Sequence, residues 1–212
     1  MFVPPVYRTE DERRIDAVIR DHPLALLTTN GDDAPHATHL PIIPESPRPG
    51  IVGATLLGHL NRANPHWSAL ADGTTGWLVF TGPNGYVTPS VYGTTPAAPT
   101  WNFVSVHLKG TIELLDGLEN TIRVVSATVA TYEERFGTGW SPDGSLEYFH
   151  RIGDAVGAFR FTVTAVDAQY KLSQDKDEAT RAHVIDWFAE SRRGNQRDLA
   201  DAMRANEMET YQ

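Results

Sequence analysis

Residues 101–115 read Trp-Asn-Phe-Val-Ser-Val-His-Leu-Lys-Gly-Thr-Ile-Glu-Leu-Leu. Apolar and polar side chains alternate in the centre of this stretch, with Val104, Val106 and Leu108 set against Ser105, His107 and Lys109. An alternation with a period of two is typical of a β-strand that buries one side and leaves the other to solvent. The stretch therefore predicts one long strand, whose partner strands the rest of the chain must supply.

Shorter strand-like runs occur on both sides of this stretch. They cover about residues 24–29, 35–43, 51–57, 76–81 and 156–168. Asn30-Gly31, between the first two runs, is a strong hairpin signal. Roughly six or seven strands joined by short links favour an antiparallel barrel over a fold in which strands and helices alternate.

Helical patterns lie at the connections and at the C-terminal end. They cover about residues 9–20, 61–71, 117–136, 177–189 and 196–208, and a short helix is expected within residues 140–150. The predicted fold is therefore mainly β with peripheral helices. We expect a single domain over residues 1–212, with a barrel and inserted helices in residues 1–168 and a helical extension in residues 169–212.

Composition and charge exclude several functional classes. The 212 residues contain no cysteine, which excludes disulfides, iron–sulfur clusters and thiolate-ligated metals. The formal net charge is −9 and the 18 Lys and Arg residues form no dense run, which argues against direct nucleic-acid binding. No apolar run approaches the roughly 20 residues that a membrane span needs, and the N-terminus has no signal-peptide pattern. We expect a cytoplasmic protein without a membrane partner.

Polar groups are concentrated in residues 58–67, Gly-His-Leu-Asn-Arg-Ala-Asn-Pro-His-Trp. This stretch follows the apolar run 51–57, and Asn61 is a good N-cap for the helical pattern that comes next. We therefore expect a strand end that turns into a helix start, where free backbone N–H groups and the helix dipole suit an anionic cofactor. His59 precedes this corner and Arg62 follows it. A strand-end histidine is nevertheless more often a hydrogen-bonded structural residue than a metal ligand.

The other histidines on predicted strands have two interpretations. His39 and His107 come from separate strands, and they either face one pocket or are ordinary outward residues of the barrel. A zinc site built from His36 and His39 is disfavoured, because their spacing suits neither a helix pair nor one face of a strand and no third ligand is evident.

Three further side chains are candidates for contact with a ligand. Tyr92 lies in the long irregular stretch 90–100, and loops of this length are often functional. It either covers the site and donates a hydrogen bond to a leaving hydroxyl, or it simply packs. Lys109 and Lys171 are candidates for binding an anion, although most lysines are only solvated surface residues.

Seven motifs, spread over nearly the whole chain, resemble the PaiB-type family of FMN-binding negative transcriptional regulators. They are residues 2–5, 37–41, 58–67, 82–89, 99–103, 106–110 and 170–174. The resemblance implies a split β-barrel that binds FMN and forms a homodimer with cofactor sites at the dimer interface. The charge balance and the lack of a basic recognition helix argue against direct contact with DNA.

Residues 94–101 of this chain are similar to those of one branch of the family, the haem-dependent piperazate synthases. These enzymes cyclise N5-hydroxy-L-ornithine to L-piperazic acid by forming an N–N bond with loss of water. This resemblance implies haem b as the cofactor, an N-hydroxylated diamino acid as the small-molecule substrate, and His59 as the axial iron ligand. FMN in a redox or regulatory protein remains the alternative.

The resemblance also suggests roles for the remaining candidates. The expected cofactor-binding residues are His59, Arg62, Asn64, His66, Trp67, Lys171 and Gln174. The expected catalytic residues are Tyr92, His39, His107 and Lys109. Structural alternatives stay open: a surface salt bridge for Arg62, helix capping for Asn64 and His66, and core packing for Trp67.

Overall fold

The computed structural model describes residues 1–46 and 50–210, and the chain divides into two compact units. The first unit comprises Met1–Val18, Thr81–Val106 and Asp167–Gln212. The second unit comprises Ile19–Phe80 and His107–Val166. The predicted single domain, with a boundary at residue 168, stays a prediction.

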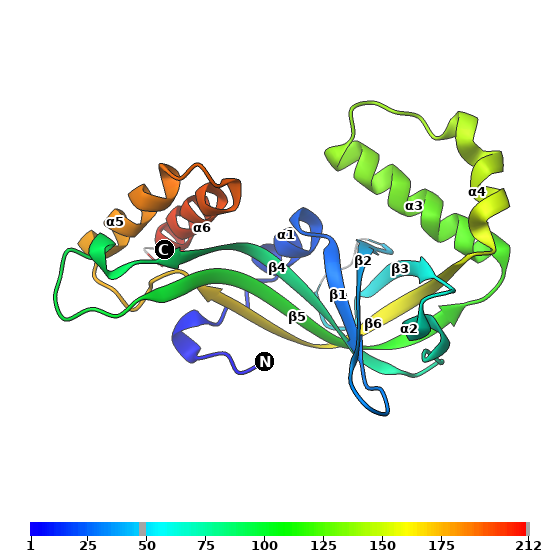
Figure 1. Cartoon of the computed structure of the whole chain (residues 1–212), viewed down its shortest axis with the longest axis horizontal. Helices are drawn as coiled ribbons and strands as arrows, with labels where there is room; N and C mark the ends of the chain where they lie inside the picture. Colours follow the sequence, from blue (N-terminus) through cyan, green and yellow to red (C-terminus); the bar gives the residue numbers. More distant parts are fainter. Residues whose placement is uncertain (47–49, 211–212) are drawn as a thin grey trace. The chain divides into compact units, whose positions relative to one another are not determined.

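Six antiparallel strands form a closed barrel in the order β1-β2-β3-β6-β5-β4 (Figure 1). Their bounds are β1 Leu24–Thr29, β2 His36–Pro44, β3 Thr55–Asn61, β4 Thr75–Val87, β5 Thr100–Leu115 and β6 Val156–Lys171. The second unit contains β1, β2 and β3 entirely, together with one end of each of the three long strands β4, β5 and β6. The other ends of these long strands belong to the first unit.

The inside of the barrel is filled by large apolar side chains that leave no room at Gly58. Phe80, Phe159 and Phe161 are completely buried. Gly58 lies opposite Phe159 on β6 and opposite Ile42 on β2. A Cβ at residue 58 would overlap the Phe159 ring and lie 2.8 Å from Ile42 Cδ1. The glycine is therefore required for close packing.

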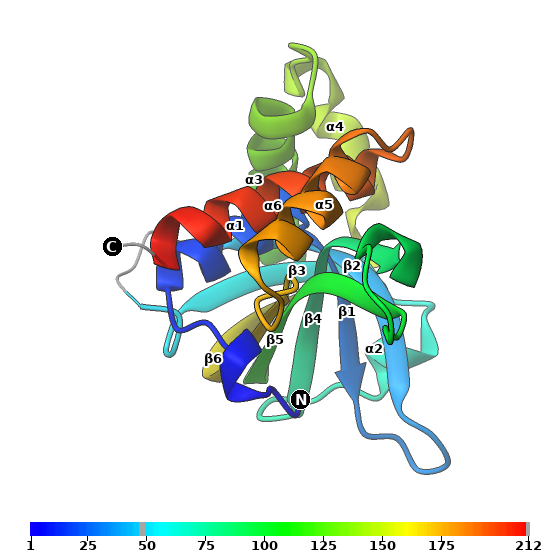
Figure 2. The same ribbon diagram turned by 90° about the vertical axis from the view of Figure 1, so that its left-hand side faces the viewer.

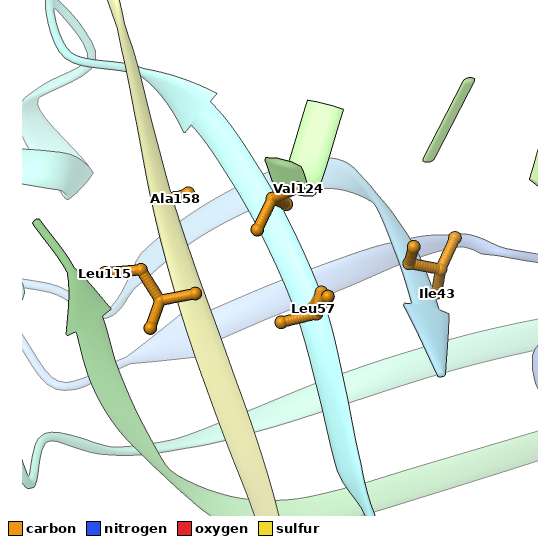
Figure 3. Packing of buried hydrophobic residues seen from close by; sticks show 5 residues of the cluster. All are labelled: Ile43, Leu57, Leu115, Val124 and Ala158. Carbon is orange, nitrogen blue, oxygen red and sulfur yellow. The ribbon is translucent and has the colours of Figure 1, made fainter. Parts of the chain in front are cut away.

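The outside of the barrel is partly covered by α3 (Leu118–Phe136), whose inward side carries Thr121, Val124 and Thr128. Figure 3 shows the apolar cluster, which comprises Ile43, Leu57, Leu115, Val124 and Ala158. Further along α3, the hydroxyl of Tyr132 donates a hydrogen bond to the carbonyl of Ile42 at 3.0 Å. The short helix α4 (Leu146–Gly153) packs beside α3, where a Cβ at Gly153 would lie 2.5 Å from Leu118 Cδ1.

The first unit contains two C-terminal helices, α5 (Glu178–Ala189) and α6 (Gly194–Thr210), which lie side by side (Figure 2). Phe188 of α5 and Met203 of α6 are buried. Helix α1 (Glu12–Asp21) begins in this unit, where the carbonyl of Arg14 accepts a hydrogen bond from Tyr170 at 2.8 Å. Single turns of 3-10 helix occur at η1 Pro5–Tyr7, η2 Pro89–Val91 and η3 Asp143–Ser145. Within the described residues, no helix combines the length and apolar character needed to cross a bilayer.

The barrel and the positions of the helices agree with the prediction, but three details differ. The helices hold about as many residues as the strands, so the fold is mixed α/β rather than mainly β. The strand predicted over residues 76–81 continues through residues 82–85 as part of β4, where two glycines admit close neighbours. A Cβ at Gly82 would lie 3.1 Å from Val104 Cβ, and one at Gly85 would lie 2.7 Å from Phe188 Cε1.

The third difference concerns the corner after His59. Strand β3 continues to Asn61, so His59 lies within the strand and not before its end. The helix that follows, α2 (Pro65–Ser68), is a single turn capped by Asn64, whose side chain accepts from His66 N. Asn61 is therefore not the N-cap. The predicted helix start at Asn61 is therefore wrong, whereas an anion site near this corner stays a prediction.

Gly58→Ala tests the packing inside the barrel. The added methyl group forces Phe159 or Ile42 to move, and we expect a loss of about 1–3 kcal/mol in the free energy of unfolding in urea. Gly144→Ala is the matched control, since nothing lies within 4 Å of a Cβ there. Replacing Phe159 by Leu in the Gly58→Ala background should recover part of the loss. Equal stability of the two single variants would contradict this account.

Candidate functional site

His59 lies on the outer side of β3, opposite Ala158 of β6. Because strand residues two apart share a face, it is on the same side as Leu57 in the apolar cluster under α3. Its Nδ1 is buried and has no hydrogen-bond partner among the described residues, although the side chain as a whole is partly exposed. Burial lowers the pKa of His59, so the imidazole is neutral at pH 7.

The outer side of the barrel is exposed next to His59 in the direction of β2 and β1. The register that pairs Ile42 with Gly58, carried one residue further, places Pro41 opposite His59, and Pro41 itself pairs with Leu24. Leu24 is 64% exposed. His59 therefore lies at the border between the part of the barrel covered by α3 and an uncovered part.

The uncovered part carries both of the other predicted histidines. We call it the open outer face, and it comprises Leu24, Leu26, His39, Trp77, Val79 and His107, all at least partly exposed. Leu26 pairs with His39 on one side and with Val79 on the other. The ring of His107 meets that of Trp77 edge-on at 6.4 Å. Lys109, two residues beyond His107, is exposed on the same side of β5.

Arg62 and Trp67 pack against each other and against the start of β6. Arg62 Nε donates to the carbonyl of Val156 at 3.0 Å, and its guanidinium lies 4.9 Å from the centre of the Trp67 ring. Trp67 in turn covers Gly157, where any Cβ would overlap the indole. These contacts give Arg62 and Trp67 structural roles, while a guanidinium still has donors left for an anion.

His66 is a structural residue with both ring nitrogens occupied. Its Nε2 bonds Thr29 Oγ1 and its Nδ1 bonds Thr38 Oγ1, each at 2.9 Å. The ring stacks on His36, with the two ring centres 5.1 Å apart. Asn64 caps α2 and also donates to Thr38 at 3.2 Å. The side chain of His66 therefore has no free nitrogen for a cofactor, and its pKa is lowered by burial and by His36.

The remaining predicted residues lie in the first unit. The Lys171 ammonium donates to Thr100 Oγ1 and to the carbonyl of Trp101, and burial lowers its pKa. Gln174 is held in a local turn, accepting from Leu172 N at 2.7 Å and donating to the carbonyl of Tyr170. Tyr92 is only 4% exposed, and its buried hydroxyl has no partner among the described residues.

The structure therefore divides the predicted site residues between the two units. His39, His59, His107 and Lys109 share the outer side of the barrel, whereas Tyr92, Lys171 and Gln174 belong to the first unit. Their roles in binding or catalysis stay predictions. No local pattern indicated Leu24 and Trp77 as members of the open outer face, because their exposure depends on which part of the barrel α3 covers. The described residues contain no group of three or more His, Cys, Asp or Glu side chains that could hold a bare metal ion.

Comparisons with known proteins point to one family and one fold. Residues 1–165 match the family described as "Putative FMN-binding domain". "Protease synthase and sporulation protein PAI 2" of Bacillus subtilis (strain 168) is 23% identical over 205 residues, which cover 96% of each chain. The FAD and haem binding protein from Mycobacterium smegmatis has a TM-score of 0.57 at 18% identity, over 83% of this chain and 78% of that one.

The flavocytochrome Anf3 from Azotobacter vinelandii also has a TM-score of 0.57, at 17% identity over 83% of this chain and 75% of that one. Likenesses at such identities show the fold alone. The fold is a mixed α/β arrangement with a six-stranded antiparallel split barrel, as predicted for the barrel itself.

His66→Asn tests the buried histidine pair through the pH dependence of stability. Because the pKa of His66 is lowered in the folded state, its contribution to stability is present above about pH 6.5 and is lost as the pH falls. We expect the free energy of unfolding in urea to fall between pH 7.5 and pH 5. The fall should be shallower in His66→Asn, which also loses about 1–3 kcal/mol at pH 7.5. His150→Asn, at an exposed position, should keep the parent slope; an unchanged slope in His66→Asn would argue against this role.

Proposed function

The chain belongs to the family described as "Putative FMN-binding domain", and within it we propose a haem-dependent enzyme that converts N5-hydroxy-L-ornithine to L-piperazic acid. The observation that carries the proposal is the state of His59. Its imidazole is kept neutral by burial, its Nδ1 is buried without a partner, and the side chain is partly exposed at the edge of the open outer face.

The chemistry of His59 fits a residue that would hold the iron of haem b. Neutral imidazole is a good iron ligand, and the burial of Nδ1 leaves Nε2 as the nitrogen that can reach a metal. A porphyrin supplies four nitrogens of its own, so one protein donor suffices where no three-residue metal cluster exists. The fold supports the proposal to a limited degree, since a structural neighbour is named as a FAD and haem binding protein.

The reaction exchanges an N–O bond for an N–N bond. The terminal nitrogen loses its hydroxyl group, the α-nitrogen bonds to it to close a six-membered ring, and water is the second product. Haem, when bound, would supply a Lewis-acidic iron that favours cleavage of the N–O bond.

The protein must free the α-amine from its proton before the ring can close. Imidazoles exchange protons near neutral pH, so His39 and His107 of the open outer face are the candidates for the base. Lys109, on the same side of β5 as His107, is suited to hold the substrate carboxylate. These residues would also fix the flexible diamino acid in a bent conformation, which brings the two nitrogens together.

A second copy of the chain is the partner that we propose for the open outer face. Its apolar members Leu24, Leu26, Trp77 and Val79 are all at least partly exposed, and burying them would be favourable. A homodimer would also exclude water from His39 and His107. Exclusion of water strengthens the electrostatic interactions of both side chains with a bound substrate.

An FMN-binding protein of the PaiB type, with a redox or regulatory function, is the second candidate. The description of the family favours it. Lys171 would then be a candidate ligand of the FMN phosphate, because its ammonium is partly buried and already aimed by Thr100 and Trp101. A yellow protein that releases flavin fluorescence on denaturation would support this candidate over haem.

His59→Ala tests the proposed iron ligand. Purified protein given haemin should show a Soret band that the variant loses, together with conversion of N5-hydroxy-L-ornithine to a product lighter by one water. His39→Ala should keep the band and lose most of the turnover, whereas His150→Ala should keep both. A protein that ignores haemin, or a variant with an unchanged Soret band, would overturn the proposal.

Leu24→Glu tests the proposed dimer. A charge at this 64% exposed position should leave the fold intact and shift the molecular mass measured by light scattering from dimer to monomer. Val52→Glu is the matched control, since Val52 is 57% exposed outside the open outer face. A monomeric parent protein would exclude the dimer, and a dimeric Leu24→Glu variant would exclude this face.

A further inference from the structure

A cavity of about 440 Å³ lies within the second unit, beside the C-terminal half of α3. Its walls come from the last turn of α1, the residue before β1, the end of β2 and the last two turns of α3. Figure 1 labels these elements. The volume is in the range of small-molecule sites. None of the residues proposed for haem binding or catalysis lines it, so it is separate from the site at His59.

One part of the cavity lining is apolar. Pro23, Ile42, Ile43 and Pro44 line it, and Figure 3 shows Ile43 beside Leu57 at the edge of the apolar cluster. Tyr132 adds no charge, because burial raises its pKa to about 12 and its hydroxyl is bonded to the carbonyl of Ile42. A hydrocarbon side chain of a ligand would therefore find a matching surface here.

The rim of the cavity carries charges of both signs. Arg20 lies in the last turn of α1 and Arg135 in the last turn of α3, and both residues are exposed. Arg135 also pairs with Asp21, but a guanidinium has five N–H donors and can hold a second carboxylate. Glu134 places a carboxylate on the same rim.

This charge pattern selects among ligand classes. A simple carboxylate would be attracted by the arginines but repelled by Glu134, and a simple amine would meet the opposite conflict. A zwitterion satisfies both signs. We infer that the cavity binds a free amino acid with an apolar side chain, whose carboxylate faces Arg20 and Arg135 and whose ammonium faces Glu134.

L-Leucine is the probe for this site, with three analogues that each lack one feature. Isocaproate lacks the ammonium, isoamylamine lacks the carboxylate, and glycine lacks the side chain. Titration calorimetry on the full chain should detect binding of leucine. Each analogue should bind at least about tenfold more weakly, because it loses a charge-assisted hydrogen bond or apolar burial. Equal binding of isocaproate and leucine would overturn the inference, as would the absence of leucine binding.

Two substitutions with matched controls locate the site. Arg20→Gln and Glu134→Gln should each weaken leucine binding by about tenfold or more. Arg13→Gln on α1 and Glu119→Gln on α3 change the same charges on the same helices outside the cavity and should leave affinity unchanged. Unchanged affinity in both cavity variants, with circular dichroism confirming their folding, would place leucine elsewhere and overturn the inference.

A last variant separates this inference from the proposed enzyme. His59→Ala without haem should bind leucine as tightly as the parent, since His59 does not line the cavity. Loss of leucine binding in this variant would assign the ligand to the His59 site and would overturn the inference. Failure of haem binding in the parent, with leucine binding intact, would affect only the proposed function.

Discussion

The partial burial of His59 depends on the contact of Val124 in α3 with Leu57 and Ala158 on the outside of the barrel. This contact removes water from one side of the strand that carries His59. The buried side lowers the pKa of the imidazole and hides one ring nitrogen, while the uncovered side leaves the ring reachable. Because the helix covers only part of the barrel, one ring nitrogen of His59 is shielded from water while the rest of the ring is partly exposed.

Much of the fold follows from local patterns. Alternation in residues 101–115 and the Asn30-Gly31 hairpin indicated the strands, and the apolar stripe of residues 117–136 indicated α3. The early end predicted for the strand at residue 81 has a clear cause. Gly82 and Gly85 are typical of turns, yet here they admit Val104 and Phe188, which come from distant parts of the sequence. Local patterns do not reveal which distant side chain a glycine accommodates.

The site was predictable only in part, for a similar reason. The density of polar groups in residues 58–67 indicated the right region of the chain. This density alone did not distinguish the role of His59 from that of His66, because both are histidines beside apolar runs. His66 is fixed by Thr29 and Thr38 from two other strands, and its role follows only from their positions. The comparisons confirm the family and the split barrel that the resemblance implied, whereas the role of His59 as an iron ligand stays a proposal supported by its burial.

The strands β4, β5 and β6 each contribute one end to each unit. No single cut of the chain separates the two units, because the border is crossed between residues 18 and 19, 80 and 81, 106 and 107, and 166 and 167. A recombination event that transfers a continuous gene segment could not move either unit to another protein.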